Sequence, residues 1–149
     1  MFFFLYMDVK DIMIKKVITI DADATVRSAC RLMDKHGVGC LLVTQGSSSA
    51  IGIVTERDVI SKVVKNGKDP EILTIKRIMT TPLVVISPEA SVETAVDTLI
   101  KNKIKKLPVV SDENDLVGIV TATDIILNSP SYLKKVASLM VRELKGIGG

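Results

Sequence analysis

Apolar positions along the chain fall into two successive sets with the same spacing. In each set, a short apolar run precedes an amphipathic helix with Thr or Ser at its predicted N-cap, and two more apolar runs joined by a polar turn follow. The predicted strands are Val17–Ile20, Gly39–Val43 and Ile51–Val54 in the first set, and Leu83–Ile86, Leu107–Val110 and Leu116–Val120 in the second. A second helix is expected to begin at Thr55 or Thr121, so each set predicts a β-α-β-β-α unit.

The two sets align without a gap, which indicates an internal repeat. Residues 11–60 align with residues 77–126 at a constant offset of 66, and the ends GIVTERD and GIVTATD share Gly, Ile, Val, Thr and Asp. A three-stranded sheet with helices on one side leaves its other face uncovered. We therefore expect an α/β fold in which two tandem β-α-β-β-α units pack sheet against sheet about a pseudo-two-fold axis.

The repeat and the chain breakers around Gly67 and Pro70 divide the chain into five parts. They are an N-terminal arm at 1–10, a first repeat at 11–64, a linker at 65–76, a second repeat at 77–128 and a C-terminal helix within 129–149, expected over Tyr132–Leu144. The hydrophobic start Met1–Met7 is too short to cross a bilayer. It is a packing arm, an interface element or a stretch before an internal start at Met7.

Composition narrows the class of protein. Hydrophobic residues make up 47% of the 149 residues, so disorder is not expected, and a net charge of +3 is too small for a dedicated nucleic-acid binder. Cys30 and Cys40 have no partner at metal spacing, and the lone His36 lies at a predicted helix end. We expect a cytoplasmic protein with no metal site and no membrane association.

The Thr and Asp of the repeated ends have two interpretations. A Thr at the N-cap with an Asp three residues later forms a capping box, which satisfies free backbone donors at the start of a helix. The same pair suits a nucleotide, because a hydroxyl can bond to phosphate or ribose oxygens and a carboxylate can accept from ribose hydroxyls. The residues alone leave both interpretations open.

Each repeat begins with an entry motif, Asp11-Ile12-Met13 or Arg77-Ile78-Met79, and ends in G-[hydrophobic]-V-T-x-x-D, and the second hairpin contains the strand Leu107-Pro108-Val109-Val110. In these motifs, and over about residues 8–128, the sequence resembles the cystathionine-β-synthase (CBS) domain family, specifically a stand-alone tandem CBS pair, or Bateman module. The resemblance implies binding of AMP, ADP or ATP, or of a related adenosine compound such as S-adenosylmethionine, in clefts to which both repeats contribute.

The resemblance also implies two nucleotide sites when its positions are transferred to this chain. Site A combines Ile53, Thr55, Arg57, Asp58, Met79, Val84, Ile104, Lys105 and Lys106, and site B combines Met13, Ile18, Val38, Gly39, Ile119, Thr121, Thr123 and Asp124. In site A, Asp58 is expected to hold the ribose, apolar side chains the base, and the three cations the phosphates. Because site B lacks those cations, we expect site A to prefer ligands with more phosphate or to bind one ligand more tightly.

The expected function is therefore that of a regulatory, ligand-sensing module with no catalytic cofactor. No GxSxG, P-loop, Cys–His pair or clustered carboxylates point to an enzyme. We expect a homodimer and an unidentified regulated protein partner, with nucleic acid unlikely. The alternative is a structural or nucleic-acid-interacting scaffold in which Thr and Asp only cap helices.

Overall fold

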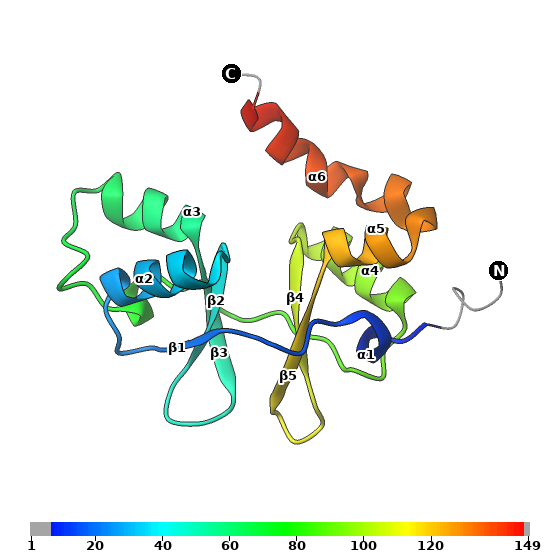
Figure 1. Cartoon of the computed structure of the whole chain (residues 1–149), viewed down its shortest axis with the longest axis horizontal. Helices are drawn as coiled ribbons and strands as arrows, with labels where there is room; N and C mark the ends of the chain where they lie inside the picture. The colour runs from blue at the N-terminus through cyan, green and yellow to red at the C-terminus, as the bar shows by residue number, and fades with distance from the viewer. Residues whose placement is uncertain (1–6, 148–149) are drawn as a thin grey trace. The chain divides into compact units, whose positions relative to one another are not determined.

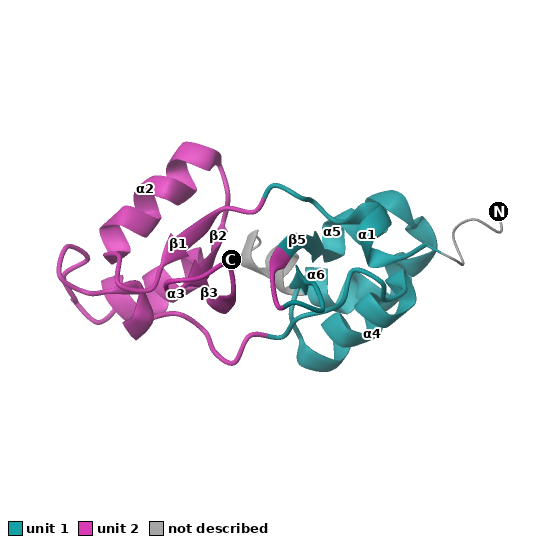
Figure 2. Ribbon diagram, turned by 90° about the horizontal axis from the view of Figure 1, so that it is seen from below, with its two compact units in different colours: residues 1–16, 84–113, 117–149 teal, residues 17–83, 114–116 magenta. Residues whose placement is uncertain are grey.

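The computed structural model describes residues 7–147, with side chains described for 7–141, and the chain forms two compact units (Figure 2). Unit 1 contains the chain up to Lys16, Val84–Glu113 and the chain from Val117 onward. Unit 2 contains Val17–Leu83 and Asn114–Leu116. Each unit has its own core, which is built almost entirely from aliphatic side chains.

Unit 2 contains a three-stranded sheet with helices beside it. Its elements are β1 (Thr19–Asp21), α2 (Val26–His36), β2 (Cys40–Thr44), β3 (Ala50–Thr55), α3 (Glu56–Asp58) continuing as a π-helix (Val59–Val64), and a 3₁₀ turn (Ile75–Arg77). The strand order is β1-β2-β3, with β1 parallel and β3 antiparallel to β2. Figure 1 shows α2 and α3 on the same side of this sheet. The expected β-α-β-β-α order of the first repeat is confirmed.

Unit 1 holds most of the second repeat and the C-terminal helix. Its elements are α1 (Val9–Ile12), α4 (Val92–Asn102), β4 (Lys106–Val110), β5 (Leu116–Thr121), α5 (Ala122–Asn128), a 3₁₀ turn (Pro130–Tyr132) and α6 (Leu133–Ile147). Strands β4 and β5 pair as the predicted hairpin. The sequence prediction for the C-terminal helix, Tyr132–Leu144, lies close to the observed α6.

The predicted strand Leu83–Ile86 is wrong, because the structure has only an isolated parallel bridge there, between Ile86 and Val109. Proline explains the difference. In unit 2, the Leu42 N–H donates to the Ile18 carbonyl at 3.1 Å and helps to pair the strands. The residue of the second repeat that aligns with Leu42 is Pro108, which has no N–H to donate. The mixed α/β fold with two β-α-β-β-α-like units is otherwise as expected.

The N-terminal ends of the helices form as the sequence predicts. Thr25 and Ser91 are the N-caps of α2 and α4, and their hydroxyls accept from the N–H groups of Ser28 and Thr94 at 3.2 and 3.1 Å. Both α2 and α4 end at a residue whose backbone lies in the left-handed region, Gly37 after α2 and Lys103 after α4.

Each unit includes the entry segment of the other repeat. In unit 1, Ile14 exchanges two backbone hydrogen bonds with Ile119, at 2.8 and 2.9 Å. In unit 2, Thr80 pairs in the same way with Ile53, at 2.8 and 3.2 Å. The units therefore do not coincide with the repeats of the sequence, and the boundaries 11–64 and 77–128 of the repeats stay a prediction.

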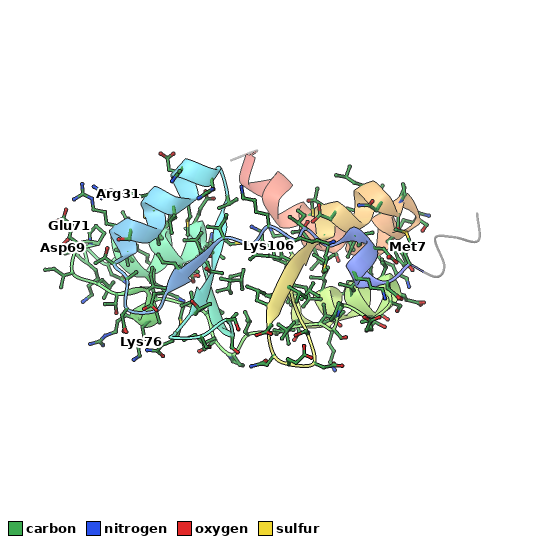
Figure 3. The ribbon with its side chains drawn as sticks, turned by 60° about the horizontal axis from the view of Figure 1, so that its bottom comes forward. Met7, Arg31, Asp69, Glu71, Lys76 and Lys106 are labelled. Atoms are coloured by element: carbon green, nitrogen blue, oxygen red, sulfur yellow. The ribbon has the colours of Figure 1, made fainter. Side chains whose placement is uncertain are left out.

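The arm that precedes α1 packs in unit 1 as far as it is described. The carbonyl of Met7 (Figure 3) accepts from the Val92 N–H at 3.0 Å, and the Val9 N–H donates to the Ala90 carbonyl at 2.8 Å. Most of the predicted hydrophobic arm, residues 1–6, lies outside the described residues, as do residues 148–149 of the predicted C-terminal part.

Candidate functional site

The turn from β3 into α3 in unit 2 brings Thr55 and Asp58 into direct contact. The Asp58 N–H donates to the Thr55 hydroxyl at 3.2 Å, and the Thr55 N–H donates to Oδ2 of Asp58 at 2.9 Å. The Thr55 hydroxyl in turn donates to the same Oδ2 at 3.1 Å. This is the capping box that the sequence predicts, with Thr55 at the N-cap and Asp58 at the third helical position.

Asp58 also has partners that sequence reasoning missed. The Lys62 ammonium lies 2.9 Å from Oδ1 and donates at 2.8 Å to the Ile78 carbonyl as well. The Thr80 hydroxyl donates to Oδ1 at 3.3 Å. Asp58 is only 6% exposed, so these contacts keep a buried carboxylate paired.

The turn from β5 into α5 in unit 1 repeats the capping box with fewer contacts. The Asp124 N–H donates to the Thr121 hydroxyl at 3.1 Å, and that hydroxyl donates to Oδ2 of Asp124 at 2.7 Å. The Thr121 N–H is 3.3 Å from the same oxygen. Among the residues that the structure describes, none donates to Oδ1, and Asp124 is half-buried rather than buried.

The other predicted residues of site A are divided between the units. Ile53 and Met79 lie in unit 2 with Thr55 and Asp58, and the exposed Arg57 belongs to the same turn. Met79 places its sulfur 2.9 Å from where a Cβ on Gly52 would lie. The remaining four residues belong to unit 1, so their part in site A stays a prediction: Val84, Ile104, Lys105 and Lys106. All four are half-buried, and Lys106, labelled in Figure 3, begins β4.

Site B is divided in the same way. Met13, Ile119 and the exposed Thr123 lie in unit 1 with Thr121 and Asp124. The other three residues belong to unit 2, and their part in site B stays a prediction: Ile18, Val38 and Gly39.

Glu56 is a further residue that the sequence analysis passed over. Its N–H donates to the Gly39 carbonyl at 3.1 Å, and its Oε2 lies 3.3 Å from the position of a Cβ on Gly39. A carboxylate therefore lies against Gly39, which is one of the predicted residues of site B. The aligned residue of the second repeat is Ala122, which carries no charge.

The missed residues differ in the signal that the sequence offered. Lys62 follows Asp58 by four residues, the spacing that places two side chains on one helix face, so this contact could have been predicted. Thr80 comes from the entry segment of the second repeat, and no local pattern connects it to Asp58.

The described residues contain no gathering of three or more His, Cys, Asp or Glu that could hold a metal ion. No described helix has the length and apolar character needed to span a membrane.

Comparison with protein families finds the CBS domain model twice in the chain, at residues 9–65 and 75–130. A CBS domain-containing protein, YhcV of Bacillus subtilis, is 36% identical over 124 residues, which are 83% of this chain and 86% of that protein. An uncharacterized protein of Methanopyrus kandleri, MK0525, is 34% identical over 116 residues, 78% of this chain and 59% of that protein.

Inosine-5'-monophosphate dehydrogenase of Methanocaldococcus jannaschii is also 34% identical over 116 residues, 78% of this chain. The match spans only 22% of the length of that enzyme. This chain thus covers less than two thirds of the length of two of these three relatives.

Two solved structures resemble the fold closely. The CBS domain pair of protein MJ0100, in complex with 5'-methylthioadenosine and S-adenosyl-L-methionine, superposes with a TM-score of 0.75 at 28% identity, covering 85% of this chain and 98% of that chain. A hexameric CBS-CP12 protein from bloom-forming cyanobacteria gives a TM-score of 0.75 at 33% identity, covering 84% of this chain and 69% of that chain.

Proposed function

This chain belongs to the CBS domain family as a tandem pair, and we propose that it is a regulatory module that binds an adenosine compound at a Thr–Asp turn. The repeated turn carries the proposal. Thr55 with Asp58, and Thr121 with Asp124, each place a hydroxyl beside a carboxylate at the start of a helix. A carboxylate accepts hydrogen bonds from both hydroxyls of a ribose, which is the part that all adenosine compounds share.

The related pair of MJ0100 supports an adenosine compound rather than one particular nucleotide. Its two ligands, 5'-methylthioadenosine and S-adenosyl-L-methionine, share adenine and ribose and have no phosphate. By charge alone, the exposed guanidinium of Arg57 next to Asp58 would favour a phosphate at that turn, as in AMP, ADP or ATP. The uncharged Thr123 at the aligned position favours an adenosine compound without phosphate at the Asp124 turn.

Regulation requires that ligand binding favours one arrangement of the protein over another. A ligand shifts such an equilibrium only by the difference between its affinities for the two arrangements. We propose that the adenosine compound changes the affinity of the module for a protein partner. No catalytic step is part of this proposal.

We further propose that two copies associate through helical faces. Ile60 and Val64 of the π-helix are 62% and 69% exposed and lie one turn apart, so they form an apolar patch on unit 2. Light scattering after gel filtration should give the mass of a dimer for the wild type and of a monomer for Ile60→Lys. A dimer in both proteins would contradict this contact.

Thermal unfolding with added ligand tests the binding proposal. A ligand at 100 times its Kd stabilises a protein by about 2.7 kcal/mol, which raises the melting temperature by several degrees. We expect AMP, ATP, S-adenosylmethionine or 5'-methylthioadenosine to produce such a rise at millimolar concentration, and GMP to produce less.

The second candidate function is a structural or nucleic-acid-interacting scaffold that binds no small molecule, because both capping boxes are complete without a ligand. It predicts that none of the adenosine compounds changes the melting temperature. A rise with GMP equal to that with AMP would instead indicate a nonspecific anion effect.

A further inference from the structure

The number of donors around Asp58 differs from the number around Asp124. A carboxylate has about four positions at which it can accept a hydrogen bond, two on each oxygen. Asp58 receives the Thr55 N–H and hydroxyl on Oδ2, and the Lys62 ammonium and Thr80 hydroxyl on Oδ1. Its capacity is therefore filled by residues of its own unit.

Among the described residues, Asp124 receives the two donors of Thr121, both on Oδ2. Oδ1 receives no donor from the part of the chain that the structure describes, and no described polar side-chain atom is both buried and unpaired, so this oxygen reaches solvent. Two acceptor positions remain, as many as the two hydroxyls of a ribose need.

The difference comes from two substitutions between the repeats. The residue that aligns with Lys62 is Asn128, whose amide donates at 2.8 Å to the Asp124 backbone carbonyl and not to the carboxylate. The residue that aligns with Thr80 is Ile14, which carries no hydroxyl and is 45% exposed. Both donors that fill Oδ1 in unit 2 are thus absent in unit 1.

We infer that Asp124 is the ribose-binding carboxylate of this protein, and that Lys62 and Thr80 hold Asp58 in a structural role. This inference rests on the proposed function and selects one of its two turns. A ligand at Asp58 has to displace an ammonium from a buried carboxylate, whereas a ligand at Asp124 displaces only water. The chain therefore takes up one adenosine compound with high affinity, at the Thr121–Asp124 turn.

The inference runs against the order of affinities expected from charge alone. Arg57 and the lysines of the second repeat favoured the Asp58 site in the sequence analysis. The direct hydrogen bonds and ion pair of the buried Asp58 carboxylate are stronger than the screened attraction that the exposed Arg57 offers to a phosphate, so the local partners of Asp58 decide its role.

Isothermal titration with 5'-methylthioadenosine separates the two turns. We expect one ligand per wild-type chain, an affinity at least about tenfold lower for Asp124→Asn, and a change of less than about twofold for Asp58→Asn. In melting experiments without ligand the order should be reversed, with Asp58→Asn losing more stability because it removes the partner of Lys62.

Equal losses of affinity in both variants, or a larger loss in Asp58→Asn, would overturn the choice of Asp124 while leaving the proposed function intact. No binding of 5'-methylthioadenosine, AMP or S-adenosylmethionine by the wild type would overturn both.

A double variant at Lys62 and Thr80 tests the role of these two residues directly, and it does so even if Asp58→Asn fails to fold. Lys62→Met with Thr80→Val frees Oδ1 of Asp58 and should raise the stoichiometry from one ligand per chain toward two. The matched control is Lys65→Met with Thr81→Val, which changes exposed neighbours of the same types and should leave the stoichiometry at one. A folded Lys62→Met, Thr80→Val protein that still binds one ligand would contradict the role assigned to Lys62 and Thr80.

Discussion

At Gly118, the thioether of Met13 occupies the space that a side chain would need. A Cβ placed on Gly118 would lie 2.7 Å from the Met13 sulfur and 3.0 Å from the Ile14 carbonyl oxygen. Gly52 meets Met79 and Thr80 in the same way, at 2.9 and 3.1 Å. The glycine of both GIVT ends therefore permits the entry segment to approach the strand closely.

Gly118→Ala should lower the free energy of unfolding by about 1–3 kcal/mol, the usual cost of inserting a methyl group into packed surroundings. Urea unfolding measures this change. In a Met13→Ala background the same substitution should cost less, because the sulfur is gone and only the backbone oxygen remains close. An equal cost in both backgrounds would show that the Met13 contact is not the cause.

The Thr–Asp pairs of both turns could be predicted residue by residue, because the spacing of a capping box is local. Lys62 was within reach of the same local reasoning. Thr80 was not, since its contact with Asp58 depends on a segment 22 residues away along the chain.

Among the elements, the helices and hairpins follow from the sequence, whereas the first strand of the second repeat does not form. Periodicity predicted Leu83–Ile86 as a strand because its apolar pattern matches that of the first repeat. The strand does not form, because Pro108 of the neighbouring strand has no N–H to donate the hydrogen bond that Leu42 donates in unit 2. A pattern of apolar residues reports burial, and pairing also needs donors on the neighbouring strand.

The N-cap of α2 provides a test at the same scale. Thr25→Ala removes the hydroxyl that accepts from the Ser28 N–H and should reduce the free energy of unfolding by about 1 kcal/mol. Thr25→Ser keeps the hydroxyl and is the matched control, which should stay within a few tenths of a kcal/mol of the wild type. Equal losses in the two variants, measured by urea unfolding, would exclude capping as the reason.

At the scale of the whole molecule, the exchange of entry segments lay beyond sequence reasoning. Ile14 and Thr80 occupy equivalent positions in the two repeats, as do Ile53 and Ile119. The sequence pattern is therefore equally compatible with pairing of either entry segment with either strand, and periodicity does not predict which pairing forms. Chain connectivity and packing make the choice, and they assign Ile14 to Ile119 and Thr80 to Ile53.

Engineered disulfides test this exchange. Ile14 and Ile119 exchange both backbone hydrogen bonds, a pairing with Cα atoms about 5.5 Å apart, which a disulfide can span. With Cys30 and Cys40 replaced by serine, Ile14→Cys with Ile119→Cys should crosslink under mild oxidation, as seen by mass spectrometry of proteolytic fragments. The register control, Ile14→Cys with Val117→Cys, should crosslink far less. Efficient crosslinking of Ile14→Cys with Ile53→Cys instead would contradict the exchange.

The account depends most on the claim that a carboxylate of a Thr–Asp turn holds the ribose of an adenosine compound. Titration calorimetry of the wild-type protein with adenosine and with 2',3'-dideoxyadenosine, which differ only in the two ribose hydroxyls, tests this claim. Hydrogen bonds to a charged group contribute about 1.5–3 kcal/mol each, so the dideoxy compound should bind at least about tenfold more weakly. Equal affinity for the two compounds would contradict the account.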